Sequence, residues 1–388
     1  MNPERRTLLK TLLSSVAVAG LPGPVQAAIR PAHWDRTLIL IELNGGNDGL
    51  NTVIPYRDPE YRRLRPTLAI DGDQVLKLDE QLGLHPSLAR LMPAWRDKQL
   101  AISLGVGYPD PDFSHFRSID IWDTASDSQD YLERGWVAEI FRTDRPPGSA
   151  AAEGVILGRN SAGPLYGPEM RTISLKQPGK LRMTGAELRS DGQLSMPPAL
   201  AHILKTERAL GDVSRALLSR RAETLDPGVD FPATDFGRQL KAVAQLIISG
   251  ARIPVFKTSL SGFDTHSNQL NRHARLLLQF AEAVAAFSAS MKRHGLWGNT
   301  LLMTYGEFGR RPRENASRGT DHGSAAPQFL IGGGVRGDLY GTQPPLDRLQ
   351  GENLTYRLHF RRMYATVIRE WWGLQQNFIH ELPLDCIV

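Results

Sequence analysis

Short apolar runs that end in polar, glycine-containing loops recur along this chain. The first run, residues 37–41, is continuous rather than alternating, which is typical of a parallel strand buried on both faces. Later apolar runs predict four further strands, at residues 100–104, 254–260, 300–305 and 328–331.

Amphipathic patterns with helical spacing lie between and after these runs. They predict helices at residues 84–95, 117–124, 135–141, 199–218, 237–249, 270–293 and 354–372. The repeated order of strand, polar loop and helix predicts an α/β fold: a doubly wound, mostly parallel sheet with helices on both faces.

The length of 388 residues and the hydrophobic content of 41% are sufficient for one large α/β domain. We expect a single domain over residues 28–388. Residues 142–232 alternate Pro- and Gly-rich loops with helical pieces. We interpret them as a loop and helix insertion within that domain.

The first 27 residues have the order of regions found in a twin-arginine signal peptide. Arg5 and Arg6 precede a weakly apolar stretch over residues 11–21, and Val25-Gln26-Ala27 offers a small-residue cleavage site. This predicts export to the periplasm or beyond by the twin-arginine machinery. The apolar stretch is too short for a stable membrane span.

Charge and cysteine content exclude several classes of function. The net charge of +5 is small and partly amino-terminal, and no Lys/Arg run is interleaved with aromatic residues, so nucleic acid is not an expected partner. The one cysteine, Cys386, excludes an intrachain disulfide and a cysteine-based zinc site.

The loop after the first predicted strand reads Glu-Leu-Asn-Gly-Gly-Asn-Asp-Gly over residues 42–49. Asn44, Asn47 and Asp48 offer oxygen atoms suited to a cation, and the glycines permit tight turns. A turn with Asn and Asp caps explains the same residues equally well. The loop is not a GxGxxG fingerprint, so a dinucleotide site is not expected.

Ser114 follows the strand at 100–104, at the start of a predicted helix. Serine at this position most often caps the helix. The alternative is a catalytic nucleophile, placed where backbone N–H groups favour an anion. Both interpretations remain open at this point.

Asp264 and His266 follow the predicted strand at 254–260. If the chain stays extended there, the two side chains lie on one face, because side chains alternate along a strand. A carboxylate and an imidazole make half of a site for zinc or a similar divalent ion. The alternative is a surface pair that caps the next helix.

Further polar residues follow the strand at 300–305. Glu307 stands at its end as an acidic ligand candidate, and Arg310 can hold an anion through its planar fork. Asp321 and His322 follow in a glycine-containing loop, and both are candidate metal ligands. Neighbours in an extended segment point opposite ways, so His322 is the better ligand of the two, and the alternative for Asp321 is to orient His322 or the loop.

These segments resemble the DUF1501 family of exported bacterial proteins, from residue 38 to about residue 373. The resemblance rests on residues 42–53, Leu84-His85-Pro86, Ser114-His115-Phe116, Phe263-Asp264-Thr265-His266, residues 306–310 and residues 319–323. The family is in turn distantly similar to the alkaline phosphatase/sulfatase superfamily.

The superfamily resemblance implies a role for several of these residues. Ser114 takes the place of the nucleophile. The metal ligands it implies are Asp48, Asp264, His266, Glu307 and His322. Phe308 departs from the pattern, because it stands where the superfamily has His or Asn.

Two functions follow as hypotheses. The first is an exported hydrolase that uses a divalent metal ion such as zinc on small phosphate or sulfate esters. The alternative, motivated by Phe308, is a non-catalytic exported binding or assembly protein that keeps the fold. A serine esterase is a weaker third option, since Ser114 lacks the Gly-x-Ser-x-Gly pattern.

Overall fold

A nine-stranded sheet runs through the residues that the computed structural model describes, which are 32–148, 150, 152–158, 161–175 and 225–388. Residues Ala32–Val388 form one unit. The predicted signal segment, 1–27, and the predicted helix at 199–218 lie outside the described residues.

The strand order of this sheet is β13-β5-β12-β9-β1-β8-β6-β7, with β14 also paired to β5. The strands are β1 (Thr37–Asn44), β5 (Leu100–Gly107), β6 (Gly154–Leu157), β7 (Thr172–Leu175), β8 (Val255–Ser261), β9 (Thr300–Gly306), β12 (Ala326–Gly332), β13 (Leu339–Tyr340) and β14 (Leu358–His359). All five strands predicted from apolar runs are present. Apart from β12, every neighbouring pair is parallel, as predicted.

Strand β12 runs antiparallel to both of its neighbours, β5 and β9. The connection from β9 to β12 contains only the short hairpin of β10 (Gly309–Arg310) and β11 (His322–Gly323). A parallel return would need a crossover, usually a helix, and the antiparallel direction avoids one.

Strands β6 and β7 fall within residues 142–232, where an insertion was expected. They instead extend the main sheet beyond β8 as parallel strands. Each has only four residues, and such short runs are hard to distinguish from loops in a Pro- and Gly-rich stretch.

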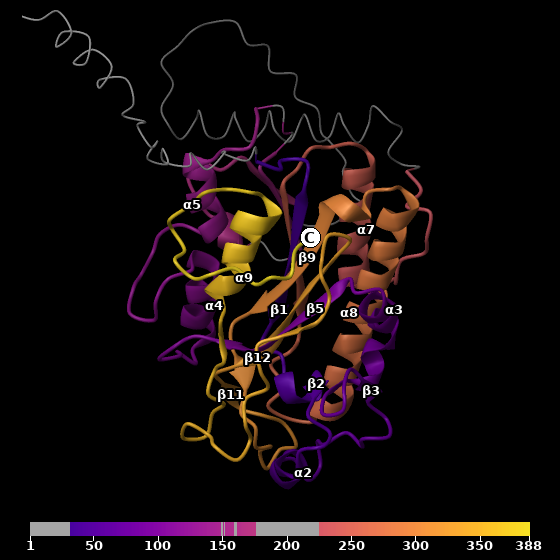
Figure 1. The fold of residues 1–388 in the computed structure, drawn as a ribbon, viewed down its shortest axis with the longest axis vertical. Helices are drawn as coiled ribbons and strands as arrows, with labels where there is room; N and C mark the ends of the chain where they lie inside the picture. Colours follow the sequence, from indigo (N-terminus) through magenta and orange to yellow (C-terminus); the bar gives the residue numbers. More distant parts are fainter. Residues whose placement is uncertain (1–31, 149, 151, 159–160, 176–224) are drawn as a thin grey trace, which may run out of the picture. The chain divides into compact units, whose positions relative to one another are not determined.

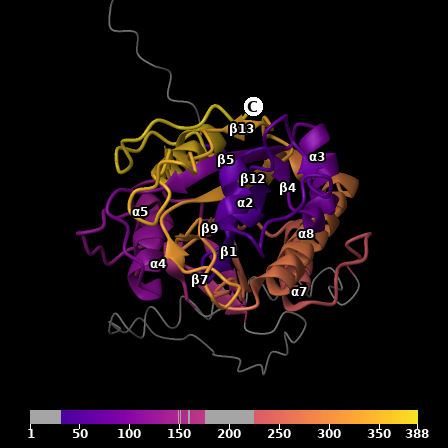
Figure 2. The ribbon, with the colours of Figure 1, turned by 90° about the horizontal axis from the view of Figure 1, so that it is seen from below.

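Helices cover both faces of the sheet (Figures 1 and 2). Ile39 and Ile41 of β1 pack into a core with α7 (Asp235–Ile248) and α8 (Gln269–Arg293). Leu38 and Leu40 pack into a second core with α4 (His115–Thr124), α5 (Trp136–Thr143) and α9 (Arg361–Ala365). This alternation confirms the doubly wound α/β class. The helices are α2 (Pro59–Leu64), α3 (Met92–Arg96), α4 (His115–Thr124), α5 (Trp136–Thr143), α7 (Asp235–Ile248), α8 (Gln269–Arg293) and α9 (Arg361–Ala365).

The helix predicted over 354–372 begins later than expected. Residues 354–360 include β14, and α9 starts at Arg361 and continues into a π-helical turn, Thr366–Trp371. Apolar residues at 354, 356, 358 and 360 alternate with polar ones, which is the period of a strand rather than a helix.

Shorter elements complete the described chain. A three-stranded sheet joins β2 (Val53–Ile54), β4 (Gly83–Leu84) and β3 (Leu76–Lys77). Short 3₁₀ helices are Gly49–Asn51, Pro86–Leu91, Gly163–Leu165 and Trp297–Asn299. Within the described ranges, no helix combines the length and hydrophobicity needed to cross a bilayer.

Candidate metal centre

The loops after three strands bring histidine and carboxylate side chains together near β11, at the lower end of the sheet in Figure 1. His115 follows β5, Asp264 and His266 follow β8, and Glu307 follows β9. These three strands run in the same direction, so their carboxyl ends meet at one edge of the sheet. His322, on β11, completes the group.

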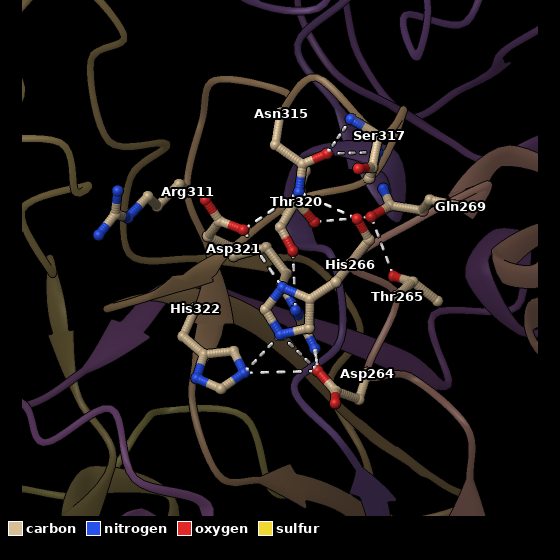
Figure 3. A network of polar contacts seen from close by, with 12 residues as sticks. Asp264, Thr265, His266, Gln269, Arg311, Asn315, Ser317, Thr320, Asp321 and His322 are labelled. Atoms are coloured by element: carbon tan, nitrogen blue, oxygen red, sulfur yellow. Dashed lines mark hydrogen bonds and ion pairs between the residues drawn. The ribbon is translucent and has the colours of Figure 1, made fainter.

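The imidazole Nε2 atoms of three histidines face the carboxylate of Asp264. His266 Nε2 lies 3.0 Å and His322 Nε2 3.4 Å from Asp264 Oδ1, and His115 Nε2 lies 3.6 Å from Oδ2. The Nε2 atoms of His266 and His322 are 3.0 Å apart (Figure 3). One ligand atom each from His115, Asp264 and His322 lies within 4.8 Å of the others, an arrangement able to hold a metal ion.

The other ring nitrogen of each histidine faces an acceptor. His115 Nδ1 contacts Glu307 Oε2, His266 Nδ1 lies 3.2 Å from Asp321 Oδ1, and His322 Nδ1 lies 2.8 Å from the Phe113 carbonyl. Carbonyls and ionised carboxylates only accept, so each Nδ1 carries the proton. In the neutral imidazole this leaves the Nε2 lone pair free, as metal-bound histidines require.

The electrostatics favour a cation among these atoms. Burial lowers the pKa of His322, which favours its neutral form. Burial raises the pKa of Asp264, but the hydrogen bond and charge of Arg310, followed by the neighbouring histidines, outweigh it and leave this pKa lowered. Lone pairs and a carboxylate thus face one another at about hydrogen-bond distance, where a cation relieves their repulsion.

Phe308 forms an apolar wall of the site. Its ring centroid lies 4.3 Å from that of His322 and 5.1 Å from that of His115. A side chain at Gly46 would meet this ring at 2.6 Å, and Gly46 also has a φ of +78°, so glycine is needed there. Phe308 therefore restrains two of the histidines by packing instead of offering a ligand atom.

The glycine-containing loop after β1 forms hydrogen bonds with Glu307 and Arg310, two residues that contact the cluster. Asn44 Nδ2 and the Gly45 N–H donate to Glu307 Oε1, at 2.6 and 3.0 Å. The carbonyls of Gly45 and Gly46 accept from Arg310. With these contacts the loop acts as a scaffold for the centre.

Asp48, predicted as a ligand, is not brought into the cluster. It is fully buried and pairs with Arg65 at 2.5 Å, and Gln269 Nε2 also donates to it at 2.5 Å. Burial raises the pKa of Asp48, but the charge and hydrogen bond of Arg65, followed by smaller effects of His273 and Arg310, outweigh this and leave the pKa lowered. Gln269 in turn accepts from Thr265 and Thr320, in the loops that carry the cluster (Figure 3).

Arg310, predicted to hold an anion, is also engaged within the protein. Its side chain is buried and donates to backbone carbonyls, including Phe263 at 3.1 Å and Thr320 at 2.8 Å, and to Asp264 Oδ1 at 2.6 Å. A guanidinium used in this way orients Asp264 and joins three loops. These contacts engage the guanidinium within the protein and do not support an anion-binding role.

The two other predicted acids do not face the centre of the cluster directly, but contact histidines that do. Glu307 is buried and contacts His115, and Asp321 contacts His266 rather than His322. Asn315 Nδ2 also donates to Asp321, at 3.1 Å (Figure 3). The hydrogen bond from Asn315 lowers the pKa of Asp321, and burial raises it by a smaller amount. The contact with His266 lowers it further, so the pKa lies below its ordinary value.

Ser114 lies at the N-cap of α4, directly before His115. Its side chain makes no capping hydrogen bond and the residue is exposed, while Asp112 accepts from its backbone N–H at 2.6 Å. The Ser114 hydroxyl therefore does not cap the helix, contrary to the simpler interpretation of the sequence. A nucleophilic role for Ser114 stays a prediction.

His115 is the candidate ligand that sequence reasoning missed. It stands in the Ser114-His115-Phe116 segment, where attention fell on the serine. A signal was present, because the first residue of a helix after a strand lies at the edge where sites form in open α/β sheets.

The fold and this cluster define an α/β protein with a candidate His/Asp metal centre at the carboxyl edge of its sheet. A family model described as "Protein of unknown function (DUF1501)" matches residues 203–375. Over those residues the resemblance predicted from the motifs is confirmed. No curated protein matches the sequence.

Several solved structures are similar to this chain. The lipoteichoic acid synthase LtaP from Listeria monocytogenes is 10% identical, with 90% of this chain and 75% of that chain covered and a TM-score of 0.40. The C-terminal periplasmic domain of EcEptC from Escherichia coli is 11% identical, with 91% and 88% covered and a TM-score of 0.41. Alkaline phosphatase from the Antarctic bacterium TAB5 is 12% identical, with 80% and 95% covered and a TM-score of 0.33.

Proposed function

We propose that this protein is an exported, metal-dependent hydrolase of phosphate or sulfate esters. One observation carries the proposal: the Nε2 atoms of His115, His266 and His322 converge on Asp264 while each Nδ1 is held by an acceptor. The amino-terminal pattern of residues 1–27 supports export through the twin-arginine route.

The donor set fits a divalent transition ion. Imidazole nitrogens and a carboxylate oxygen are ligands that zinc accepts, and the second ring nitrogens have the partners that metal-bound histidines require. A divalent ion held by these residues would polarise an ester and lower the pKa of a hydroxyl or a water.

The surroundings favour an anionic substrate that enters from solvent. His115 is the first residue of α4, so the cluster lies at the end of the helix where backbone N–H groups attract negative charge. The side chains of Asp264 and His266 are 44% and 45% exposed, which leaves the centre open to a small ester. Ser114, exposed beside His115, is the proposed nucleophile.

Purified protein is expected to carry stoichiometric divalent metal and to hydrolyse aryl phosphates or aryl sulfates. His322→Ala removes one Nε2 donor, so we expect metal affinity to fall at least about 100-fold, with turnover reduced to match. His380→Ala, at an exposed histidine, is the matched control. Metal analysis and initial rates give the answer, and unchanged turnover in His322→Ala refutes the assignment.

Ser114→Ala separates the nucleophile from the metal centre. Metal content is expected to stay at the wild-type value, because the Ser114 hydroxyl is not among the proposed ligands. If Ser114 is the nucleophile, kcat falls by about 100-fold or more, the scale associated with activated groups. A wild-type kcat in this variant assigns the attack to a water and removes Ser114 from the proposal.

Two observations favour a second candidate, a non-catalytic exported binding or assembly protein. Arg310 is occupied within the protein, and Phe308 takes a position where a ligand was expected. This candidate predicts a partner that co-purifies with the protein, with no turnover across a panel of phosphate and sulfate esters. Turnover that depends on His322 excludes it.

A further inference from the structure

A buried ion pair lies in the sheet behind the metal centre. Lys257 of β8 and Glu42 of β1 are 2.6 Å apart, and their side chains are 1% and 4% exposed. Taking two charges out of water is costly, and well-packed apolar residues often serve stability as well or better. Stability alone is therefore a weak explanation for this pair.

Hydrogen bonds connect the ion pair to a proposed ligand. Asn44 Nδ2 donates to Glu42 Oε1 at 3.2 Å and to Glu307 Oε1 at 2.6 Å, and Glu307 Oε2 contacts His115 Nδ1. Both hydrogens of the Asn44 amide thus go to carboxylates, which accept only. This arrangement fixes which way the amide faces, with its nitrogen toward Glu307.

We propose that the Lys257–Glu42 pair positions His115 for metal binding, through Asn44 and Glu307. Lys257 compensates the charge of Glu42, and Glu42 keeps the Asn44 nitrogen turned toward Glu307. Glu307 then holds the proton of His115 on Nδ1 and leaves Nε2 free. The inference rests on the proposed metal centre, in which His115 is a ligand.

The double variant Glu42→Leu/Lys257→Met removes both charges together, so no buried charge is left alone. With one of its two acceptors gone, the Asn44 amide is held less firmly, and it fixes the Glu307 carboxylate against His115 less well. Nuclear magnetic resonance of the metal-free protein should then show a smaller fraction of the Nδ1–H tautomer at His115 than in the wild type. Zinc affinity, measured by competition with a chromogenic chelator, should fall about tenfold, the low end for partners behind a ligand.

Two further variants calibrate the effect. Glu307→Gln, which alters the group that touches His115, should weaken zinc binding at least as much. Thr258→Val is the matched control: its buried hydroxyl donates to the Leu40 carbonyl at 3.2 Å, in the same pair of strands, and is expected to leave the tautomer and the affinity unchanged.

The proposal is overturned if the folded double variant keeps the Nδ1–H tautomer and wild-type zinc affinity. If that variant does not fold, Asn44→Ala is the test, because it removes the amide that joins Glu42 to Glu307 and leaves the ion pair intact. Asn44→Ala must then show the same tautomer change, and a wild-type tautomer refutes the inference. The tautomer is read on metal-free protein, so a failure of the hydrolase proposal is seen separately, in metal content and turnover.

Discussion

Replacing Asp264 by asparagine is expected to weaken divalent metal binding strongly and, with it, to reduce ester hydrolysis. Asp264 is the carboxylate on which the three Nε2 atoms converge, with Oδ1 toward His266 and His322 and Oδ2 toward His115. Asparagine keeps the shape but removes the negative charge and offers one donor group in place of an acceptor. We expect metal affinity to fall by about 100-fold or more.

The fold should survive this substitution. Arg310 loses a charged partner, but it still donates to four backbone carbonyls, and the asparagine oxygen can replace one carboxylate oxygen. Thermal unfolding of the metal-free variant should therefore differ little from that of the wild type. Asp347→Asn, at an acid that is 62% exposed, is the control. Wild-type metal affinity in Asp264→Asn contradicts the account.

Acid is expected to destabilise the metal-free protein through two buried histidines outside the metal centre. Burial lowers the pKa of His85 to about 4 and that of His273 to about 3, from an ordinary value of 6.5. Below pH 6.5 the two histidines therefore bind protons in the unfolded chain but stay neutral in the folded chain. Stability is complete above pH 6.5 and is lost as the pH falls toward 4 for His85 and 3 for His273.

The size of this effect is about 1.4 kcal/mol per pH unit for each histidine, or about 4 kcal/mol for both between pH 7 and pH 5. Asp123 acts in the opposite direction, because burial raises the pKa of its carboxyl well above the ordinary value. A comparison with a variant that lacks only the two histidines removes this offset.

The matched variant is His85→Asn/His273→Gln. The asparagine oxygen replaces His85 Nδ1, which accepts from the Ser87 N–H, and the glutamine amide replaces His273 Nε2, which lies 2.9 Å from Asn47 Oδ1. Urea unfolding at pH 7, 6 and 5, with chelator present, should show the wild type losing about 4 kcal/mol relative to the variant. Parallel curves for the two proteins would contradict the assignment.

Much of the fold follows from local pattern. The continuous apolar run at 37–41 predicts a central strand, and β1 lies in the middle of the sheet between β8 and β9. The long amphipathic pattern at 270–293 matches α8 to within one residue. Short strands were missed, because runs of two to four residues, as in β6, β7 and β14, carry little periodicity.

The candidate site was only partly predictable. Asp264 and His266 stand two residues apart, so a local argument could pair them, and their side chains do meet, 3.0 Å apart. The contact of His115 with Glu307 joins residues 192 positions apart, and no local pattern contains it. Without that contact, the sequence predicts Glu307 as a ligand rather than as the partner of a candidate ligand.

Arg310 shows the same limit. Its sequence position, after a strand and beside other polar residues, is that of an anion-binding group. Its guanidinium donates hydrogen bonds to the carbonyls of Gly45 and Gly46, more than 260 positions away in the sequence. The residue is only 1% exposed to solvent. Only the fold distinguishes an arginine that binds a ligand from one that joins loops.

Anomalous diffraction from zinc-loaded crystals, recorded on both sides of the zinc edge, would locate a bound metal ion without reference to activity. We expect an anomalous peak among the Nε2 atoms of His115, His266 and His322 and the carboxylate of Asp264. Glu307 and Asp321 should remain in contact with the Nδ1 atoms of His115 and His266. A map without a peak at this position, or with zinc bound only elsewhere, would show that this cluster is not a metal centre.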